Sequence, residues 1–176
     1  ATSWNPFVDG PVYDLAVGGG IVYLAGGFNH VDGHERRQLA GIDEASGAVT
    51  PWYPKVEGEV RQLAYGSGKL LAGGAIKTVV SIVRNGLAAI DLATGKPTAW
   101  DPNPDGPVSV LAVHDGLVYA SGSFTHIGGQ GRSLAALDPV TGAATDWNPG
   151  LGVGAACLAF TDEVVFAAGV ELMALD

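Results

Sequence analysis

Four tryptophans divide the chain into segments of nearly equal length. Trp4, Trp52, Trp100 and Trp147 lie 48, 48 and 47 residues apart. The residues after each of the first three follow the pattern W-x-P-x3-G-x-V-x-x-L-A, and the fourth copy carries one extra residue before its glycine. A fixed period of this size is typical of a protein that is built from copies of one supersecondary unit.

Each unit contains four short segments that are typical of β-strands. In the first unit these are residues 11–17, 21–25, 37–43 and 48–52, and Gly, Asn and Asp residues separate them. Such spacing indicates antiparallel hairpins, and no stretch with a helical period of useful length appears. The sequence therefore predicts an all-β chain, a β-propeller whose blades are four-stranded antiparallel sheets.

The two ends of the sequence complement each other. The chain opens with a fourth-strand motif and closes after three strands of a unit, so residues 1–7 are expected to complete the last blade and close a ring of four. The whole of residues 1–176 then forms one domain, with units at about 4–51, 52–99, 100–146 and 147–176. Two alternatives stay open: a larger ring, of which these residues are a part, and a homodimer that forms an eight-bladed ring.

Composition excludes several classes of partner. Hydrophobic residues make up 47% of the chain and charged residues 15%, which indicates a well-buried core. The formal net charge is −9, and the nine basic residues are scattered, which argues against nucleic acid and anionic membranes as partners. No apolar run reaches the roughly 18–20 residues of a membrane span. The single cysteine, Cys157, is expected to be a small buried hydrophobe.

Two loop-containing segments carry a resemblance to a known family. These are V-Y-L-A-G-G-F-N-H-V-D-G at 22–33 and V-Y-A-S-G-S-F-T-H-I-G-G at 118–129, each followed by an arginine and an L-A-x-[IL]-D strand. They resemble the bacterial delta-sixty-type repeat propellers, which are similar to kelch and YVTN-type repeats. The resemblance covers nearly the whole chain. It implies a propeller fold and a secreted or cell-surface location.

The loops differ between units. The second unit has Ala-Ile-Lys-Thr-Val-Val-Ser at 75–81 in place of the histidine-containing loop, and the fourth unit passes from Gly169 almost directly to Leu172. The ring is therefore expected to be asymmetric on the face that bears these loops. A binding site could have diverged there, because loops carry function more often than the strands that they connect.

His30 and His126 occupy the same repeat position on alternate units. We expect each imidazole to fix its own loop by hydrogen bonding to backbone carbonyls. The alternative is that both histidines bind a ligand or a metal. A metal site would require them to converge within about 2 Å of one ion.

Arg36, Arg84 and Arg132 recur just before the third strand of their units. Their repetition predicts a shared structural role, such as hydrogen bonding to loop carbonyls or to an aspartate of a neighbouring blade. A role of these arginines in binding a ligand is the alternative. The repeated tryptophans are likewise expected to wedge between neighbouring blades, with stacking on a sugar ring as the alternative.

The segment Asp101-Pro102-Asn103-Pro104-Asp105-Gly106 partly matches a calcium-binding loop. The side-chain oxygens of Asp101, Asn103 and Asp105 suit a hard cation, but the twelfth position is Ala112 where a bidentate glutamate is needed. Turn formation is the favoured interpretation. Calcium is thus a weak expectation, and no other cofactor is predicted.

No catalytic constellation is evident, so the sequence favours a non-enzymatic module. We expect an extracellular or cell-surface domain that recognises a glycan, a peptide or a protein partner through one face or the central channel. One alternative is an enzyme or metal-dependent site that is assembled from the loops of different blades. The other is a structural repeat segment of a larger surface assembly.

Overall fold

The computed structural model describes residues 4–66, 68–151 and 154–175, and these residues form strands, turns and bends without a helix. Every ladder among them is antiparallel. The predicted all-β class is therefore confirmed. In this described part of the chain, no helix is long and apolar enough to cross a membrane.

Four three-stranded sheets share one topology, in which the first strand of the sheet pairs with the second and the second with the third. They are β1(Val12–Gly18), β2(Ile21–Gly26) and β5(Leu39–Asp43); β7(Val60–Gly66), β8(Lys69–Gly74) and β11(Leu87–Ile90); β12(Val108–His114), β13(Leu117–Gly122) and β16(Leu134–Leu137); and β17(Cys157–Phe160), β18(Val165–Ala168) and β19(Leu172–Leu175). Each sheet thus corresponds to one repeat unit, as the spacing of the tryptophans predicts.

The expected fourth strand is reduced to a single bridge. Val49, Pro97 and Ala144 pair with the last or next-to-last residue of β5, β11 and β16, and the pairing extends no further. The next ladder bond would use the carbonyl oxygen of Thr50, Thr98 or Thr145, and these oxygens instead accept hydrogen bonds from Arg36, Arg84 and Arg132. The structure therefore differs from the predicted four-stranded blade at this edge.

In each of the first three units, a small hairpin lies in the chain between the second and third strands of the main sheet, and its strands belong to a separate small sheet. The hairpins are β3(His30–Val31) with β4(His34–Glu35), β9(Thr78–Val79) with β10(Ile82–Val83), and β14(His126–Ile127) with β15(Gln130–Gly131). The short β6(Val56–Glu57) pairs with β9. In the described part of the fourth unit, β18 leads to β19 without such a hairpin. The expected asymmetry of the loops is thus present at the fourth unit, whereas the second unit builds the same hairpin from a different sequence.

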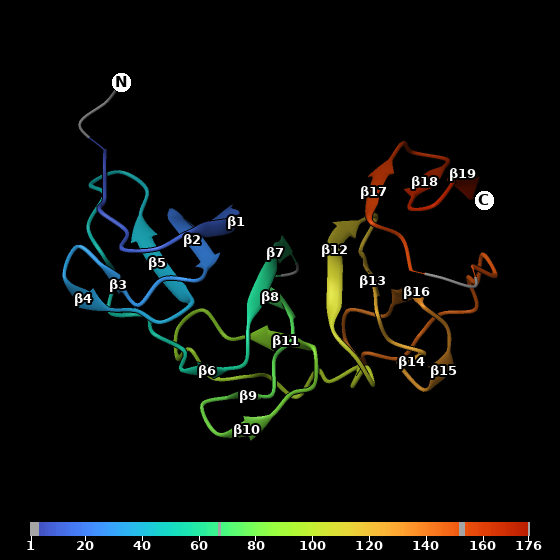
Figure 1. Cartoon of the computed structure of the whole chain (residues 1–176), viewed down its shortest axis with the longest axis horizontal. Coiled ribbons are helices and arrows are strands. Elements are labelled where there is room, and N and C mark those ends of the chain that lie inside the picture. The colour runs from blue at the N-terminus through green and yellow to red at the C-terminus, as the bar shows by residue number, and fades with distance from the viewer. Residues whose placement is uncertain (1–3, 67, 152–153, 176) are drawn as a thin grey trace.

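The four sheets follow one another along an arc, and the first and last sheets lie at its opposite ends (Figure 1). The expected closing strand falls partly on residues 1–3, which lie outside the described residues. Its described part, residues 4–7, contains no strand. The first and last sheets do not meet in Figure 1, so the predicted closure of a four-bladed ring is not observed in the described residues.

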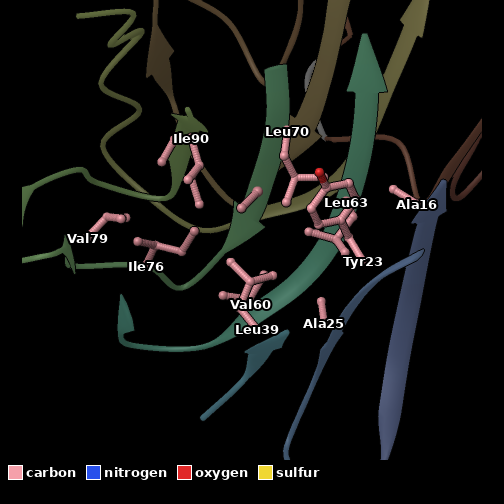
Figure 2. Packing of buried hydrophobic residues seen from close by; sticks show 12 residues of the cluster. Ala16, Tyr23, Ala25, Leu39, Val60, Leu63, Leu70, Ile76, Val79 and Ile90 are labelled. Atoms are coloured by element: carbon pink, nitrogen blue, oxygen red, sulfur yellow. The ribbon is translucent and has the colours of Figure 1, made fainter. Parts of the chain in front are cut away.

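The core lies between neighbouring sheets, which pack face to face. Figure 2 shows one such layer, in which Ala16, Tyr23 and Leu39 of the first sheet meet Leu63 and Leu70 of the second. Equivalent clusters join the second sheet to the third and the third to the fourth. Each sheet therefore depends on its neighbours to cover its apolar faces.

Cys157 differs from its prediction, because the structure places it in β17 with its side chain exposed. The equivalent residue of the third unit, Val110, is buried. The last sheet has no further sheet on its outer side in Figure 1. The strand itself is present as expected, but the covering layer that burial of Cys157 would require is missing.

A β-bulge interrupts the first strand of each of the first three sheets. The ladder shifts register between Val12 and Asp14 in β1, and at the equivalent places in β7 and β12. The facing strand places a glycine here, and a Cβ at Gly26 or Gly122 would collide with the carbonyl oxygen of Pro11 or Pro107. Bulges bend a strand and re-aim side chains. In each strand, the bulge leaves one residue without a ladder partner.

Candidate functional site

The two repeated histidines bond to an aspartate of their own unit. One carboxylate oxygen of Asp9 accepts hydrogen bonds from the backbone N–H groups of Asn29 and His30, at 2.8 and 2.9 Å. The other oxygen lies 2.9 Å from Nδ1 of His30. The loop-fixing role is thus observed, but the prediction of a backbone carbonyl as the partner was wrong.

The same arrangement recurs in the third unit around Asp105. Its carboxylate accepts hydrogen bonds from the N–H groups of Thr125 and His126 and from the hydroxyl of Thr125, and it lies 3.1 Å from Nδ1 of His126. These donors stabilise the ionised form. Backbone N–H groups, that of His30 foremost, lower the pKa of Asp9 to about 2. The Thr125 hydroxyl, followed by the backbone N–H groups, lowers the pKa of Asp105 further below its ordinary value.

The structure does not bring His30 and His126 together. They lie in β3 and β14, which are widely separated in Figure 1. Across residues 4–66, 68–151 and 154–175, no group of three or more His, Cys, Asp or Glu side chains is arranged to hold a metal ion. The two histidines therefore act in separate loops.

The three repeated arginines bond to loop carbonyls, as the sequence predicted. A terminal guanidinium nitrogen of Arg36, Arg84 and Arg132 donates to the carbonyl of the threonine that stands two residues before the next tryptophan, at 2.7, 2.6 and 2.9 Å. Each arginine thereby ties the start of the third strand to the end of its own unit. Terminal nitrogens of all three guanidinium groups are thus bonded within the fold, whereas the buried Nε atom of each has no hydrogen-bond partner among the described residues.

The calcium-like segment turns its three oxygen-bearing side chains to three different protein groups. The Asp101 carboxylate lies 3.3 Å from the guanidinium of Arg84. The amide oxygen of Asn103 accepts a hydrogen bond from Asn85 at 2.9 Å. Asp105 serves the loop of the third unit, as described above. These oxygens therefore do not converge on a common centre.

The tryptophans join neighbouring sheets. The indole N–H of Trp52 donates to the carbonyl of Asp91, which follows β11 of the second sheet, at 3.3 Å, while its ring meets the edge of Tyr23 in the first sheet, 5.1 Å away. The indole N–H of Trp100 donates at 2.9 Å to the carbonyl of Asp138, which follows β16 of the third sheet, and the Trp100 side chain is buried against residues of the second and third sheets. The predicted wedge between blades is thus observed at these two residues.

A hollow lies where the three bulged strands run side by side. It has a volume of about 400 Å³ and is lined by Tyr13, Glu59, Arg61, Gln62 and Ser109. Three of these residues, Tyr13, Arg61 and Ser109, are the ones that the bulges of β1, β7 and β12 leave without a ladder partner. The bulges therefore direct one side chain from each of three sheets towards a common surface.

The hollow offers several kinds of polar contact beside one aromatic ring. The Tyr13 side chain is exposed. The Arg61 guanidinium pairs with Glu59 at 3.0 Å, and this bond raises the pKa of Arg61. Gln62 adds an amide and Ser109 a hydroxyl. None of the five lining residues is a histidine or a cysteine. The arrangement is suited to holding a polar ligand.

The sequence analysis did not single out this hollow, although the repeat contains a signal for it. The pattern V-x-x-L-A is kept in the first three units, but the residue after the valine changes from Tyr13 to Arg61 to Ser109. Positions that repeat unchanged make the same bonds in each unit, as the arginines do. The residue after the valine changes while its neighbours stay the same, so it is not needed for a bond that is common to all three units.

A larger hollow, of about 490 Å³, lies against the last sheet. Its lining includes Leu151 and Gly154, which flank residues 152–153, outside the described part of the chain. It also includes Val170, an exposed residue of the connection between β18 and β19. The hollow at the bulges, in contrast, is lined by four strand residues and by Glu59, which directly precedes β7.

Comparisons with known proteins bear on the fold alone. No family model matches the chain, and no curated protein does, so the resemblance to delta-sixty-type repeats stays a prediction. The structure is similar to that of the computationally designed Ika4 protein, with a TM-score of 0.64 and 16% identity over 96% of this chain and 93% of that one. It is also similar to the computationally designed Ika8 protein, with a TM-score of 0.57 and 15% identity over 89% of this chain and 42% of that one.

Proposed function

We propose that this chain is a non-enzymatic binding module, a set of β-propeller blades that holds a polypeptide partner in the hollow at the bulges. The observation that carries the proposal is the convergence of Tyr13, Arg61 and Ser109, the three bulged residues, on one surface. The resemblance to secreted and surface repeat proteins supports a location outside the cell or at its surface, as part of the same proposal.

The propeller architecture is supported by the way in which the sheets pack. Neighbouring sheets stack face to face along an arc, and the first strands β1, β7 and β12 follow one another. In a propeller these first strands line the central channel, where ligands commonly bind. The hollow would then lie at one mouth of that channel.

The chemistry of the hollow favours a peptide segment as the ligand. Tyrosine and arginine are enriched where proteins meet and supply a large share of the binding energy there. The Tyr13 ring can cover an apolar side chain, while Arg61, Glu59 and Gln62 can pair with backbone amides and carbonyls. The surface is open, so a segment of extended chain can reach it.

Selection from a random peptide library displayed on phage tests the proposal. We expect enriched peptides that bind the immobilised chain, and we expect Tyr13→Ala and Arg61→Ala to weaken them by roughly tenfold or more, as for hot-spot residues. Arg37→Ala is the matched control, because the Arg37 side chain is about as exposed as that of Arg61 and likewise pairs with a glutamate, Glu35 at 3.1 Å, but it does not line the hollow.

Two results would contradict the proposal. One is an absence of enriched peptides. The other is a set of peptides that bind the Tyr13 and Arg61 variants as tightly as the unmodified chain. A glycan array that is probed in parallel tells whether the hollow takes a sugar, in which case the site would stand and the assignment to peptides would fall.

A further inference from the structure

We infer that the two end sheets of the arc are the two halves of one interface, and that a second copy of this chain covers them both. The first sheet of each copy would pack on the last sheet of the other, which yields a closed ring of two chains. This inference rests on the propeller architecture proposed above. It does not rest on peptide binding at the hollow.

The outer face of the first sheet repeats a surface that is buried elsewhere in the chain. Val12 and Leu15 of β1 are exposed, and their equivalents 48 and 96 residues later are buried against the preceding sheet. The exposed fraction is 55% for Leu15, 5% for Leu63 and 7% for Leu111. The first sheet thus presents the contact surface of an interior sheet with its partner missing.

The outer face of the last sheet shows the complementary pattern. Phe166 of β18 is exposed, whereas the equivalent Tyr23, Leu71 and Tyr119 are buried against the following sheet. In β19, the exposed fraction is 76% for Leu172, against 0% for Leu39, 0% for Leu87 and 1% for Leu134 at the same repeat position. This face is therefore the other half of the same kind of junction.

A specific aromatic contact is expected where the two faces meet. Inside the chain, Tyr23 meets the edge of Trp52 at 5.1 Å, and Tyr119 meets the edge of Trp147 at 5.4 Å. Phe166 occupies the same position as these tyrosines. Trp4 is the tryptophan that precedes the first sheet, and its N–H donates to Asp43 just as that of Trp52 donates to Asp91. Phe166 of one copy would therefore pack against Trp4 of the other.

The geometry favours a second copy over contact within one chain. The two faces lie at opposite ends of an open arc (Figure 1), so they cannot meet without a change in the angles between the sheets. Two copies related by a two-fold axis form the junction twice and leave neither face exposed. The arc also aligns with 42% of the Ika8 chain, so an arc of this shape occurs as less than half of a longer all-β chain.

Sedimentation and native mass spectrometry of the 176-residue chain test the inference. We expect a dimer of twice the 17.9 kDa chain mass that dissociates on dilution. Leu15→Lys and Phe166→Glu each place one unpaired charge in both junctions, and we expect each to weaken the dimer by about a hundredfold or more. Both residues are exposed in the single chain, so the variants should keep its circular dichroism spectrum.

A mixture of the two variants distinguishes the proposed contact from other dimers. In a mixed dimer, one junction is unmodified, and in the other the lysine introduced in one chain faces the glutamate introduced in its partner. We therefore expect mixing to restore the dimer. Val140→Glu is the control, because Val140 is also an exposed apolar residue but lies in a turn of the third unit, outside the first and last sheets. It should leave the dimer unchanged.

Cys157 provides a second readout, since it is exposed on the outer side of the last sheet. A thiol reagent should label it quickly in dilute solution and slowly where the dimer prevails. A chain that stays monomeric at high concentration would overturn the inference. So would a dimer that survives both single variants, or one that mixing does not restore.

Discussion

Single carboxylates organise the loops of the first and third units. Asp9 and Asp105 each bind two consecutive backbone N–H groups and the imidazole that follows, so one side chain replaces several bonds that a regular ladder would supply. The second unit has Glu57 at this position, and there the backbone itself pairs with Thr78. The same repeat position thus fixes its loop through an aspartate side chain in the first and third units and through backbone pairing in the second.

The stabilisation from Asp9 should depend on pH in a defined window. Its pKa falls from 3.8 to about 2 in the folded chain, so its contribution is complete above about pH 4 and is lost as the pH falls towards 2. We expect the melting temperature of Asp9→Asn to lie below that of the unmodified chain at neutral pH, and the difference to vanish near pH 2. Thermal melts across this range measure it.

Asp162→Asn is the control for this series, because Asp162 lies in an exposed bend and makes none of the hydrogen bonds described for Asp9. Its melting temperature should follow that of the unmodified chain at every pH. A gap between Asp9→Asn and the unmodified chain that stayed constant from pH 7 to pH 2 would contradict the role that we assign to the carboxylate.

At this scale the sequence predicted roles better than partners. The repetition of His30 and His126 indicated that each fixes its own loop, and it does. The partner was missed because Asp9 lies 21 residues earlier in the chain, and only the fold makes the two neighbours. Asp9, Glu57 and Asp105 stand one period apart, so a comparison of acidic positions between units could have found them.

At the scale of the element, an arginine connects the start of the third strand to the end of the unit in each of the first three units. Arg84 donates to Thr98 and Val83 and pairs with Asp101, and its side chain is only 12% exposed. Removal of a buried charged donor leaves its acceptors unsatisfied, so we expect Arg84→Ala to lower the free energy of unfolding by about 2 kcal/mol. Urea denaturation measures this change.

Arg37→Ala serves again as the matched control, because its guanidinium is largely exposed and pairs only with Glu35. Exposed ion pairs contribute little, so we expect a loss below about 1 kcal/mol. Equal losses in the two variants would show that the buried carbonyl bonds of Arg84 do not hold the unit together.

Strands were predictable, whereas their irregularities were harder to foresee. Expected segments 11–17 and 21–25 correspond closely to β1 and β2, because β-branched and apolar residues alternate between glycine turns. The bulges could have been inferred from the spacing of the apolar residues. Val12 and Leu15 are three residues apart, whereas residues on one face of a regular strand are two or four apart. The hairpin of the second unit forms with Val80 and Ser81 at φ values of 49° and 65°, which nothing in its apolar residues predicts.

At the scale of the whole molecule, the same substitution at one repeat position should lower the free energy of unfolding by different amounts in different sheets. Leu63 is buried between two sheets, and Leu15 is its exposed equivalent. In solutions dilute enough to keep the chain monomeric, we expect Leu63→Ala to cost about 3 kcal/mol and Leu15→Ala less than about 0.5 kcal/mol. Urea unfolding at low protein concentration measures both.

This pair of variants also tests the open arc itself. If the first and last sheets met within one chain, Leu15 would be buried as Leu63 is, and the two substitutions would cost the same. Equal costs in the monomer would therefore contradict the arrangement in Figure 1. The two leucines control for each other, because they share residue type and strand position.

The number and packing of the sheets followed from the sequence, whereas the closure of the ring did not. The period of the tryptophans indicated one sheet per unit, and the apolar faces required neighbours. Whether four sheets complete a circle depends on the angle between successive sheets. That angle is set by the sizes of many side chains in each layer, and no single motif such as the repeated W-x-P encodes it.

The indole bonds of Trp52 and Trp100 to the sheet that follows make the first two junctions between sheets alike and local. Duplication of one whole unit would therefore lengthen the chain by a sheet and still leave the same two faces at its ends. The proposed ring could therefore contain more sheets without any new kind of contact between them. A deletion within a unit would instead break this regularity, because it would move a tryptophan away from the carbonyl to which its indole N–H bonds.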